Sequence, residues 1–172
     1  MTGEARLTCR DLPVDDPAWD APAWRAPAWR APAWRAPADG AGGAFAVLQE
    51  LRPHLERAAF AEIHRTGAAQ GLRYTGAFDP SGTCLGVAGW RILQTTAVGR
   101  KLYVDDLVTT AAARSRGVGT ALLDHLTDIA RAQGCAVVDL DSGRQRLDAH
   151  RFYRREGFEE RSLHFTRPVG PA

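Results

Sequence analysis

A basic, glycine-containing turn at residues 114–120 constrains the fold more than any other feature of this 172-residue chain. The turn follows the strand-like run Lys101–Thr109 and opens an amphipathic helix that ends near Gly134. The short, largely apolar run Cys135–Asp141 comes next, as expected for a strand that is covered on both faces. A strand, a helix and a second strand in this order predict two neighbouring parallel strands with a right-handed crossover.

The same turn has the chemistry of an anion site. Gly117 and Gly119 lack side chains where an anion must approach the backbone. The first N–H groups of a helix have no intrahelical partners, and the helix dipole adds partial positive charge there. Arg114 and Arg116 can add charge-assisted hydrogen bonds. The turn therefore predicts a phosphorylated ligand, although its spacing matches neither a Walker loop nor the G-x-G-x-x-G fingerprint.

Composition favours one soluble domain. The hydrophobic content of 45% is ordinary for a globular protein, and 172 residues are enough for a sizeable core. A net charge of +2 argues against a nucleic-acid coat or a polybasic membrane binder. The three cysteines form no C-x-x-C pair, which weighs against structural zinc and a disulfide framework. With no visible signal peptide or apolar span, we expect a cytoplasmic monomer or homodimer with no metal, nucleic-acid or membrane partner.

Residues 17–38 form a tandem repeat of Pro-Ala-Trp-Asp/Arg-Ala. Proline at every fifth position prevents a continuous helix and pushes each preceding alanine toward extended geometry. We expect residues 17–43, which end in a glycine-rich joint, to form a disordered or partly polyproline-II insert that does not pack. Two roles stay open: a partner-binding strip with tryptophan anchors, or a duplication carried in a tolerant loop, which the lack of differentiated units favours.

The other patterns predict a lead-in with a first strand in residues 1–16 and a mixed α/β domain in residues 44–172. Three successive strands are expected to form an antiparallel meander: Leu72–Phe78, Cys84–Leu93 and Lys101–Thr109. Helices are predicted at Phe45–Leu55, at Glu56–Gln70 and at about Leu147–Glu156. The first and last strands are predicted at Ala5–Leu12 and Ser162–Arg167.

Three motifs in this order resemble the GNAT N-acetyltransferase superfamily. Leu107-Val108-Thr109 and Arg114-x-x-Gly117-x-Gly119 look like its acetyl-CoA motif, and Phe152–Phe158 looks like its terminal helix, often ending in Tyr-x-x-x-Gly-Phe. The resemblance covers about residues 44–168. It implies an α/β (α+β) fold with a central mixed sheet, in which the antiparallel meander is followed by a splayed parallel strand pair with a crossover helix. Helices would cover both faces.

By this resemblance, acetyl-CoA is the co-substrate and lies between the splayed strands. The backbone of Leu107, Val108 and Thr109 would bind the acetyl-pantetheine arm. The pyrophosphate would be held by the turn, whose residues are Arg114, Ser115, Arg116, Gly117, Val118, Gly119 and Thr120. The implied reaction is direct attack of a primary amine, on a small molecule or a protein, on the acetyl thioester.

Candidate acid and base residues follow. Tyr153 occupies the family position of the acid that protonates the departing thiolate; the alternative is a packed aromatic. The attacking ammonium must lose a proton to a base or a water chain. Asp105 and Asp106 are adjacent on a strand, so only one of them should face the cleft. We rank Asp141 and Asp105 ahead of Asp106 as the base. Arg146 stands where many family members carry asparagine and could reach a phosphate or an acidic substrate.

Two other functions remain open from the sequence. One is a non-catalytic acyl-CoA-binding or sensing module, with the tryptophan repeat recruiting a partner. The other is a nucleotide-phosphate binder unrelated to acyl transfer, because an Arg/Gly turn is a generic anion site. Turnover with an amine would distinguish the enzyme from both.

Overall fold

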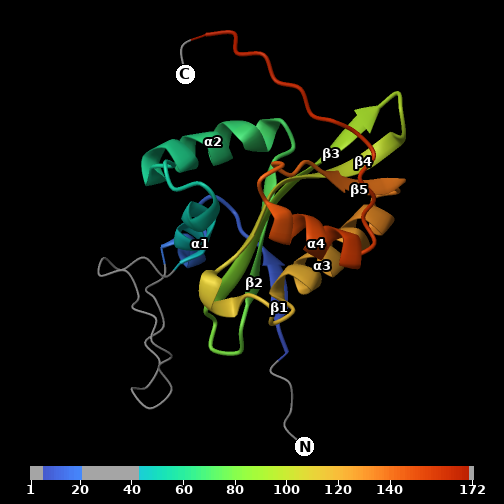
Figure 1. The fold of residues 1–172 in the computed structure, drawn as a ribbon. Helices are drawn as coiled ribbons and strands as arrows, with labels where there is room; N and C mark the ends of the chain where they lie inside the picture. The colour runs from blue at the N-terminus through green and yellow to red at the C-terminus, as the bar shows by residue number, and fades with distance from the viewer. Residues whose placement is uncertain (1–5, 21–42, 171–172) are drawn as a thin grey trace, which may run out of the picture.

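A computed structural model describes residues 6–20 and 43–170 of the chain (Figure 1). Five strands form one sheet in the order β1-β2-β3-β4-β5. Their bounds are Thr8–Asp11 for β1, Arg73–Phe78 for β2, Cys84–Thr95 for β3, Gly99–Thr109 for β4 and Val137–Leu140 for β5. Neighbours from β1 to β4 are antiparallel, whereas β4 and β5 are parallel. The predicted mixed α/β class, the meander and the parallel crossover are confirmed.

Helices cover both faces of the sheet, as predicted (Figure 1). The four α-helices in the described residues are α1 (Ala44–Leu51), α2 (Arg57–Ala69), α3 (Val118–Ala132) and α4 (Leu147–Arg155). Two short 3-10 helices, η1 (Pro17–Trp19) and η3 (Ala111–Ala113), precede α1 and α3. The helix predicted to run to Leu55 ends at Leu51, because Pro53 disfavours helical geometry in the residue before it.

Two apolar clusters fill the space on either side of the sheet. The cluster beneath α1 and α2 contains Val87 of β3, and the cluster beneath α3 contains the adjacent Ala88. Successive strand residues point to opposite faces, so β3 contributes to both clusters. Both residues are fully buried. The sheet is therefore packed on both faces, and a ligand that reaches its centre must pass between strands.

Such a passage begins where β4 and β5 separate. The two strands pair only from Lys101 to Val104 on β4, while β4 itself continues to Thr109. A β-bulge precedes the separation: Trp90 of β3 lies opposite Val104, Gly89 lies opposite Asp106, and Asp105 is the extra residue. The predicted splayed pair is thus present, and the bulge lies at the point of divergence.

The predicted strand at Ser162–Arg167 is wrong. The structure assigns no strand there, and the side chains of Leu163 and Phe165 are 58% and 84% exposed. An alternating pattern becomes a strand only when a neighbouring strand pairs its backbone groups and a core buries its apolar face. In the described part of the chain this segment has neither. The predicted first strand is confirmed in shorter form, as β1 paired with β2.

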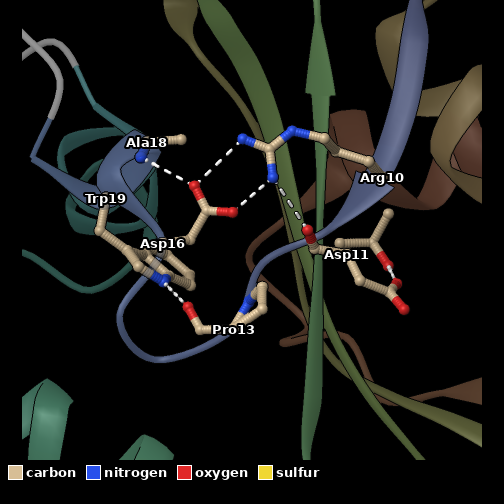
Figure 2. A network of polar contacts seen from close by, with 7 residues as sticks. Arg10, Asp11, Pro13, Asp16, Ala18 and Trp19 are labelled. Atoms are coloured by element: carbon tan, nitrogen blue, oxygen red, sulfur yellow. Dashed lines mark hydrogen bonds and ion pairs between the residues drawn. The ribbon is translucent and has the colours of Figure 1, made fainter.

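The first unit of the tryptophan repeat packs, contrary to the prediction that the repeat does not. Trp19 is 1% exposed and meets the Phe60 ring edge-on at a centroid distance of 4.7 Å. Figure 2 shows why the chain turns inward there: Asp16 pairs with Arg10, and its Oδ1 accepts a 2.8 Å hydrogen bond from the Ala18 N–H. The indole Nε1 also donates to the carbonyl of Pro13 at 2.7 Å. Asp16 caps the 3-10 turn and has no counterpart before later units.

Trp19 and Gly43 lie close together in the structure. A Cβ atom on Gly43 would lie 2.3 Å from the backbone oxygen of Trp19, so only glycine allows this approach. Residues 21–42, which hold the other repeat units, lie outside the described residues. Because the flanking residues touch, the length of the segment between them places little constraint on the packing of the domain.

His64 is a buried titratable group beside Trp19, at a ring-centroid distance of 5.8 Å. Its Nδ1 has no hydrogen-bond partner among the described residues. Burial lowers the pKa of His64, and the charges of Arg73 and Arg57 lower it further. The folded protein therefore resists a protonation that the unfolded chain accepts near pH 6.5.

We expect this difference to make stability fall as pH decreases. The contribution of neutral His64 is present above the unfolded pKa and is lost as pH drops below it. Urea unfolding between about pH 7.5 and 5.5 should show wild type losing more stability than His64→Phe. Replacement of the exposed His54 in the same way is the control. Equal losses in wild type and His64→Phe would contradict the assignment.

Candidate active site

A cavity of about 140 Å³ lies where β4 and β5 separate. It brings together six residues singled out from the sequence: Asp105, Asp106, Leu107, Asp141, Arg146 and Tyr153. The other predicted site residues, Val108, Thr109 and the turn at residues 114–120, are not part of this lining. The candidate catalytic groups and the candidate phosphate turn are therefore separate features on neighbouring elements.

The cavity passes from one face of the sheet to the other. Leu51 and Arg52, at the end of α1, contribute to its lining from one face. Tyr153 contributes from α4, which packs against α3 on the other face. Two contacts join these helices: the Thr120 hydroxyl donates to Glu156 at 3.1 Å, and the Phe152 ring lies against Gly119. Ligands could therefore meet inside the sheet after entering from opposite sides.

The phosphate turn has the backbone geometry expected of an anion site. Gly117 precedes α3 with φ of +77°, and no side chain caps the start of the helix. Ser115 also has a left-handed conformation, with φ of +59°. The first N–H groups of α3 are consequently left for a ligand or solvent. The Val118 side chain is buried in the core, so only its backbone can take part.

Position 119 requires a glycine for a packing reason that the sequence did not indicate. A Cβ atom at this position would lie 2.9 Å from the ring of Phe152. The glycine therefore allows α4 to pack on α3 and places Tyr153 beside the cavity. This packing requirement adds to the predicted role of Gly119 in anion approach, which stays a prediction.

Glu50 of α1 contacts the segment that leads from β4 to the phosphate turn. Its carboxylate accepts hydrogen bonds from the Thr110 hydroxyl at 2.6 Å and from the Ala111 N–H at 2.8 Å. The next residues, Leu51 and Arg52, line the cavity. One end of α1 thus contacts both the chain leading to the phosphate turn and the cavity.

Asp105 and Asp106 both line the cavity, so the expectation that only one would face it is wrong. The bulge at Asp105 interrupts the strict alternation on which that expectation depended. Asp105 accepts two hydrogen bonds from Arg91, at 2.8 and 2.9 Å, which engage both carboxylate oxygens. Asp106 accepts a 2.9 Å hydrogen bond from Arg52 on Oδ1.

Asp141 has a different environment. The Tyr103 hydroxyl donates to its Oδ2 at 2.7 Å, and Nδ1 of His164 lies 3.0 Å from the same oxygen. Burial raises the pKa of Tyr103 and the Asp141 charge raises it further, so the phenol remains a donor at neutral pH. Both contacts use Oδ2, which leaves Oδ1 for a ligand. Asp141 is therefore better placed than Asp105 to accept a proton.

Tyr153 is set between the rings of Phe152 and Phe158, at centroid distances of 5.4 and 5.8 Å. Burial raises the pKa of Tyr153, and the positive charge of Arg146 opposes this effect. The phenol is therefore protonated at neutral pH and can donate a proton or a hydrogen bond into the cavity.

Ser142 is a cavity-lining residue with a buried hydroxyl, and its Oγ has no hydrogen-bond partner among the described residues. The neighbouring Gly143 carbonyl lies 3.0 Å from Nε2 of His150, a contact that fixes the loop.

The sequence did not single out Arg52, Arg91, Tyr103 or Ser142. Arg52 and Ser142 lie in connections, where no periodic pattern places a side chain. Tyr103 carried a usable signal, because it lies two residues from Asp105 on a strand and such residues share a face. The contact of Arg91 with Asp105 on β4 depends on the register between β3 and β4, which the sequence does not give.

Comparisons with known proteins agree with the fold and the motifs. The model of the acetyltransferase (GNAT) family matches residues 29–158. YhdJ, an uncharacterized N-acetyltransferase of Bacillus subtilis, is 51% identical over 72 residues, 41% of this chain and 51% of that protein. An aminoalkylphosphonate N-acetyltransferase of Salmonella typhimurium is 34% identical over 66 residues, 38% of this chain and 43% of that protein. The chain spans about half the length of these curated relatives.

The overall structure also has solved counterparts. The aminoglycoside N-acetyltransferase AAC(6')-Iy, solved in complex with CoA, superimposes with a TM-score of 0.72 at 16% sequence identity. That match covers 98% of each chain. At this identity the likeness supports the fold alone. In the described residues, no helix combines the length and apolar character needed to cross a membrane.

Proposed function

The chain belongs to the acetyltransferase (GNAT) family, and we propose that it transfers the acetyl group of acetyl-CoA to a primary amine. The observation that carries the proposal is the cavity between β4 and β5, whose lining contains Tyr153 and three aspartates. The names of the two curated relatives, both N-acetyltransferases, support the same reaction class.

The donor site in this proposal has two parts. The backbone amides at the start of α3, with Arg114 and Arg116, would hold the pyrophosphate. The β5-facing side of Leu107–Thr109, beyond the last β4–β5 pair, would accommodate the acetyl-pantetheine arm. Both parts fit the co-substrate, since one offers unpaired N–H groups and the other an unpaired stretch of strand.

When bound, acetyl-CoA supplies a thioester whose carbonyl carbon forms a bond to the amine nitrogen as its bond to sulfur breaks. Asp141 would take the proton that the ammonium must lose, through Oδ1 or a water. Tyr153 would give its proton to the departing sulfur, and the phenol is protonated for this role. The second proton that the amine nitrogen loses as the amide forms would return to Tyr153, which balances the transfer. Backbone N–H groups near Leu107 and Val108 would stabilise the carbonyl oxygen as negative charge develops.

The test is release of free CoA on mixing the protein with acetyl-CoA and a panel of amines. Acetyl-CoA binding together with turnover supports the enzyme. Binding without turnover of any amine would favour the alternative, a non-catalytic acyl-CoA-binding module with a partner-binding tryptophan repeat. Displacement of CoA by ATP at similar concentration would favour a generic nucleotide-phosphate site.

A paired substitution tests the donor site. We expect Arg114→Ala/Arg116→Ala to raise the KM for acetyl-CoA by about ten-fold or more, because each removes a charge-assisted hydrogen bond to phosphate. The kcat should change little, since neither residue lines the cavity. Arg131→Ala, at the opposite end of α3 and paired there with Asp128, is the matched control. Unchanged KM in the double variant would remove the turn from the donor site.

A further inference from the structure

The charges around the cavity are balanced in the described part of the chain. Three carboxylates line it: Asp105, Asp106 and Asp141. Three guanidinium groups accompany them: Arg52 and Arg146 in the lining, and Arg91 bonded to Asp105. An acceptor with several positive charges is held best by a surplus of carboxylates, and these residues offer none.

Arg52 and Asp106 form an ion pair on the α1 side of the cavity. Both Nε and Nη2 of Arg52 contact the same oxygen, Oδ1 of Asp106, at 2.9 and 2.8 Å. The second oxygen, Oδ2, is not used in this pair. The Arg52 side chain is 45% exposed and the Asp106 side chain 14%, so the arginine lies nearer solvent and the aspartate lies deeper.

We infer that the acceptor is a small zwitterion, with one primary ammonium group and one oxyanion. This inference rests on the proposed acetyl transfer and specifies its acceptor. The oxyanion binds Arg52 at the mouth, and the ammonium binds Oδ2 of Asp106. A volume of about 140 Å³ suits a small molecule, being below the range of pockets for drug-sized ligands.

The order of charges also fits the reaction. Asp106 directly precedes Leu107, whose backbone is assigned to the acetyl-pantetheine arm. An ammonium at Asp106 is therefore held next to the thioester, and the oxyanion at Arg52 points away from it. The reverse orientation would place an oxyanion among the deeper carboxylates, which repel it.

A matched series of two-carbon amines tests the inference. The series consists of 2-aminoethanesulfonate and 2-aminoethylphosphonate, which carry an ammonium and an oxyanion, ethanolamine as the monocation, and ethylenediamine, which has a second basic nitrogen in place of the oxyanion. CoA release is measured for each amine with wild type, Arg52→Gln, Arg52→Lys and Arg65→Gln. Arg65 is an exposed α2 residue paired with Glu62, so Arg65→Gln makes the same charge change away from the cavity.

We expect at least one zwitterion to have a kcat/KM about ten-fold or more above ethanolamine, and ethylenediamine to be poorest. Arg52→Gln should reduce kcat/KM for that zwitterion about ten-fold more than for ethanolamine, mainly through KM. Arg52→Lys should restore part of the preference, and Arg65→Gln should match wild type. Thermal unfolding of each variant separates a lost contact from a lost fold.

The outcomes separate the two proposals. If ethanolamine or ethylenediamine is the best acceptor, or if Arg52→Gln lowers all amines equally, the zwitterion inference is overturned while acetyl transfer stands. If no amine in this series or in the wider panel releases CoA although acetyl-CoA binds, the proposed function itself fails.

Discussion

Replacing Tyr153 with phenylalanine is expected to lower kcat by about 100-fold while the affinity for acetyl-CoA stays nearly unchanged. The substitution removes only the hydroxyl, because the ring keeps its contacts with Phe152 and Phe158. Burial raises the pKa of Tyr153, so wild type carries the proton that the departing thiolate needs. Steady-state kinetics with the best acceptor and calorimetric titration with CoA measure the two quantities.

A change of leaving group shows whether the lost hydroxyl acted as an acid. An activated acetyl ester with a p-nitrophenolate leaving group departs without a proton, so Tyr153→Phe should slow its reaction much less than that of acetyl-CoA. Equal losses with both donors would assign Tyr153 to positioning. Unchanged kcat with acetyl-CoA would leave it as a packed aromatic.

The elements that followed from the sequence are those with strong local patterns. The turn at residues 114–120 connects a strand to a helix. Its glycines and arginines predict this turn from the local sequence alone. The meander follows from strand propensity and from Asp79-Pro80-Ser81-Gly82 between β2 and β3. These elements determine the sheet order, so the mixed fold was predictable from local patterns, whereas the splayed pair was expected from the resemblance to the GNAT superfamily.

The cavity depends instead on pairings between distant segments. The bulge at Asp105 arises from the register of β4 against β3. The local sequence of either strand does not predict it. Arg52 reaches Asp106 across 54 positions of sequence. The predicted acid and the preferred base are brought to one cavity, but the guanidinium groups around them appear only in three dimensions.

Two failures have a common physical cause. The first is the predicted strand at Ser162–Arg167, and the second is the prediction that the repeat at residues 17–38 does not pack. Both rest on local sequence patterns, whereas long-range contacts determine whether a segment pairs or packs. The first segment has no strand beside it in the described structure, so it forms no strand. The second is preceded by Asp16, which caps the turn that directs Trp19 toward the rings of Phe60 and Tyr74. The local sequence pattern favours a conformation for each segment, but long-range packing determines which structure the segment adopts.

Trp19→Ala is expected to lower the free energy of unfolding by about 3–5 kcal/mol. The indole is 1% exposed, is packed edge-on against three rings, and donates to the Pro13 carbonyl at 2.7 Å. Its removal leaves a cavity between η1 and α2 and an unpaired carbonyl. Such a loss is a large part of the total stability of a domain of this size. Urea unfolding followed by circular dichroism measures it, and the milder Trp19→Phe provides a second point if the alanine variant does not fold.

The control is a deletion of residues 22–36, which removes three repeat units with their tryptophans and keeps Trp19 and Gly43. Because Trp19 and Gly43 already touch, shortening the segment between them should change the free energy of unfolding by at most about 1 kcal/mol. A large loss on deletion, or a small loss for Trp19→Ala, would contradict the distinction between the first unit and the others. The expected contrast would assign the repeat two parts: one tryptophan that belongs to the core, where Asp16 directs it, and a segment whose length the domain tolerates because its ends meet.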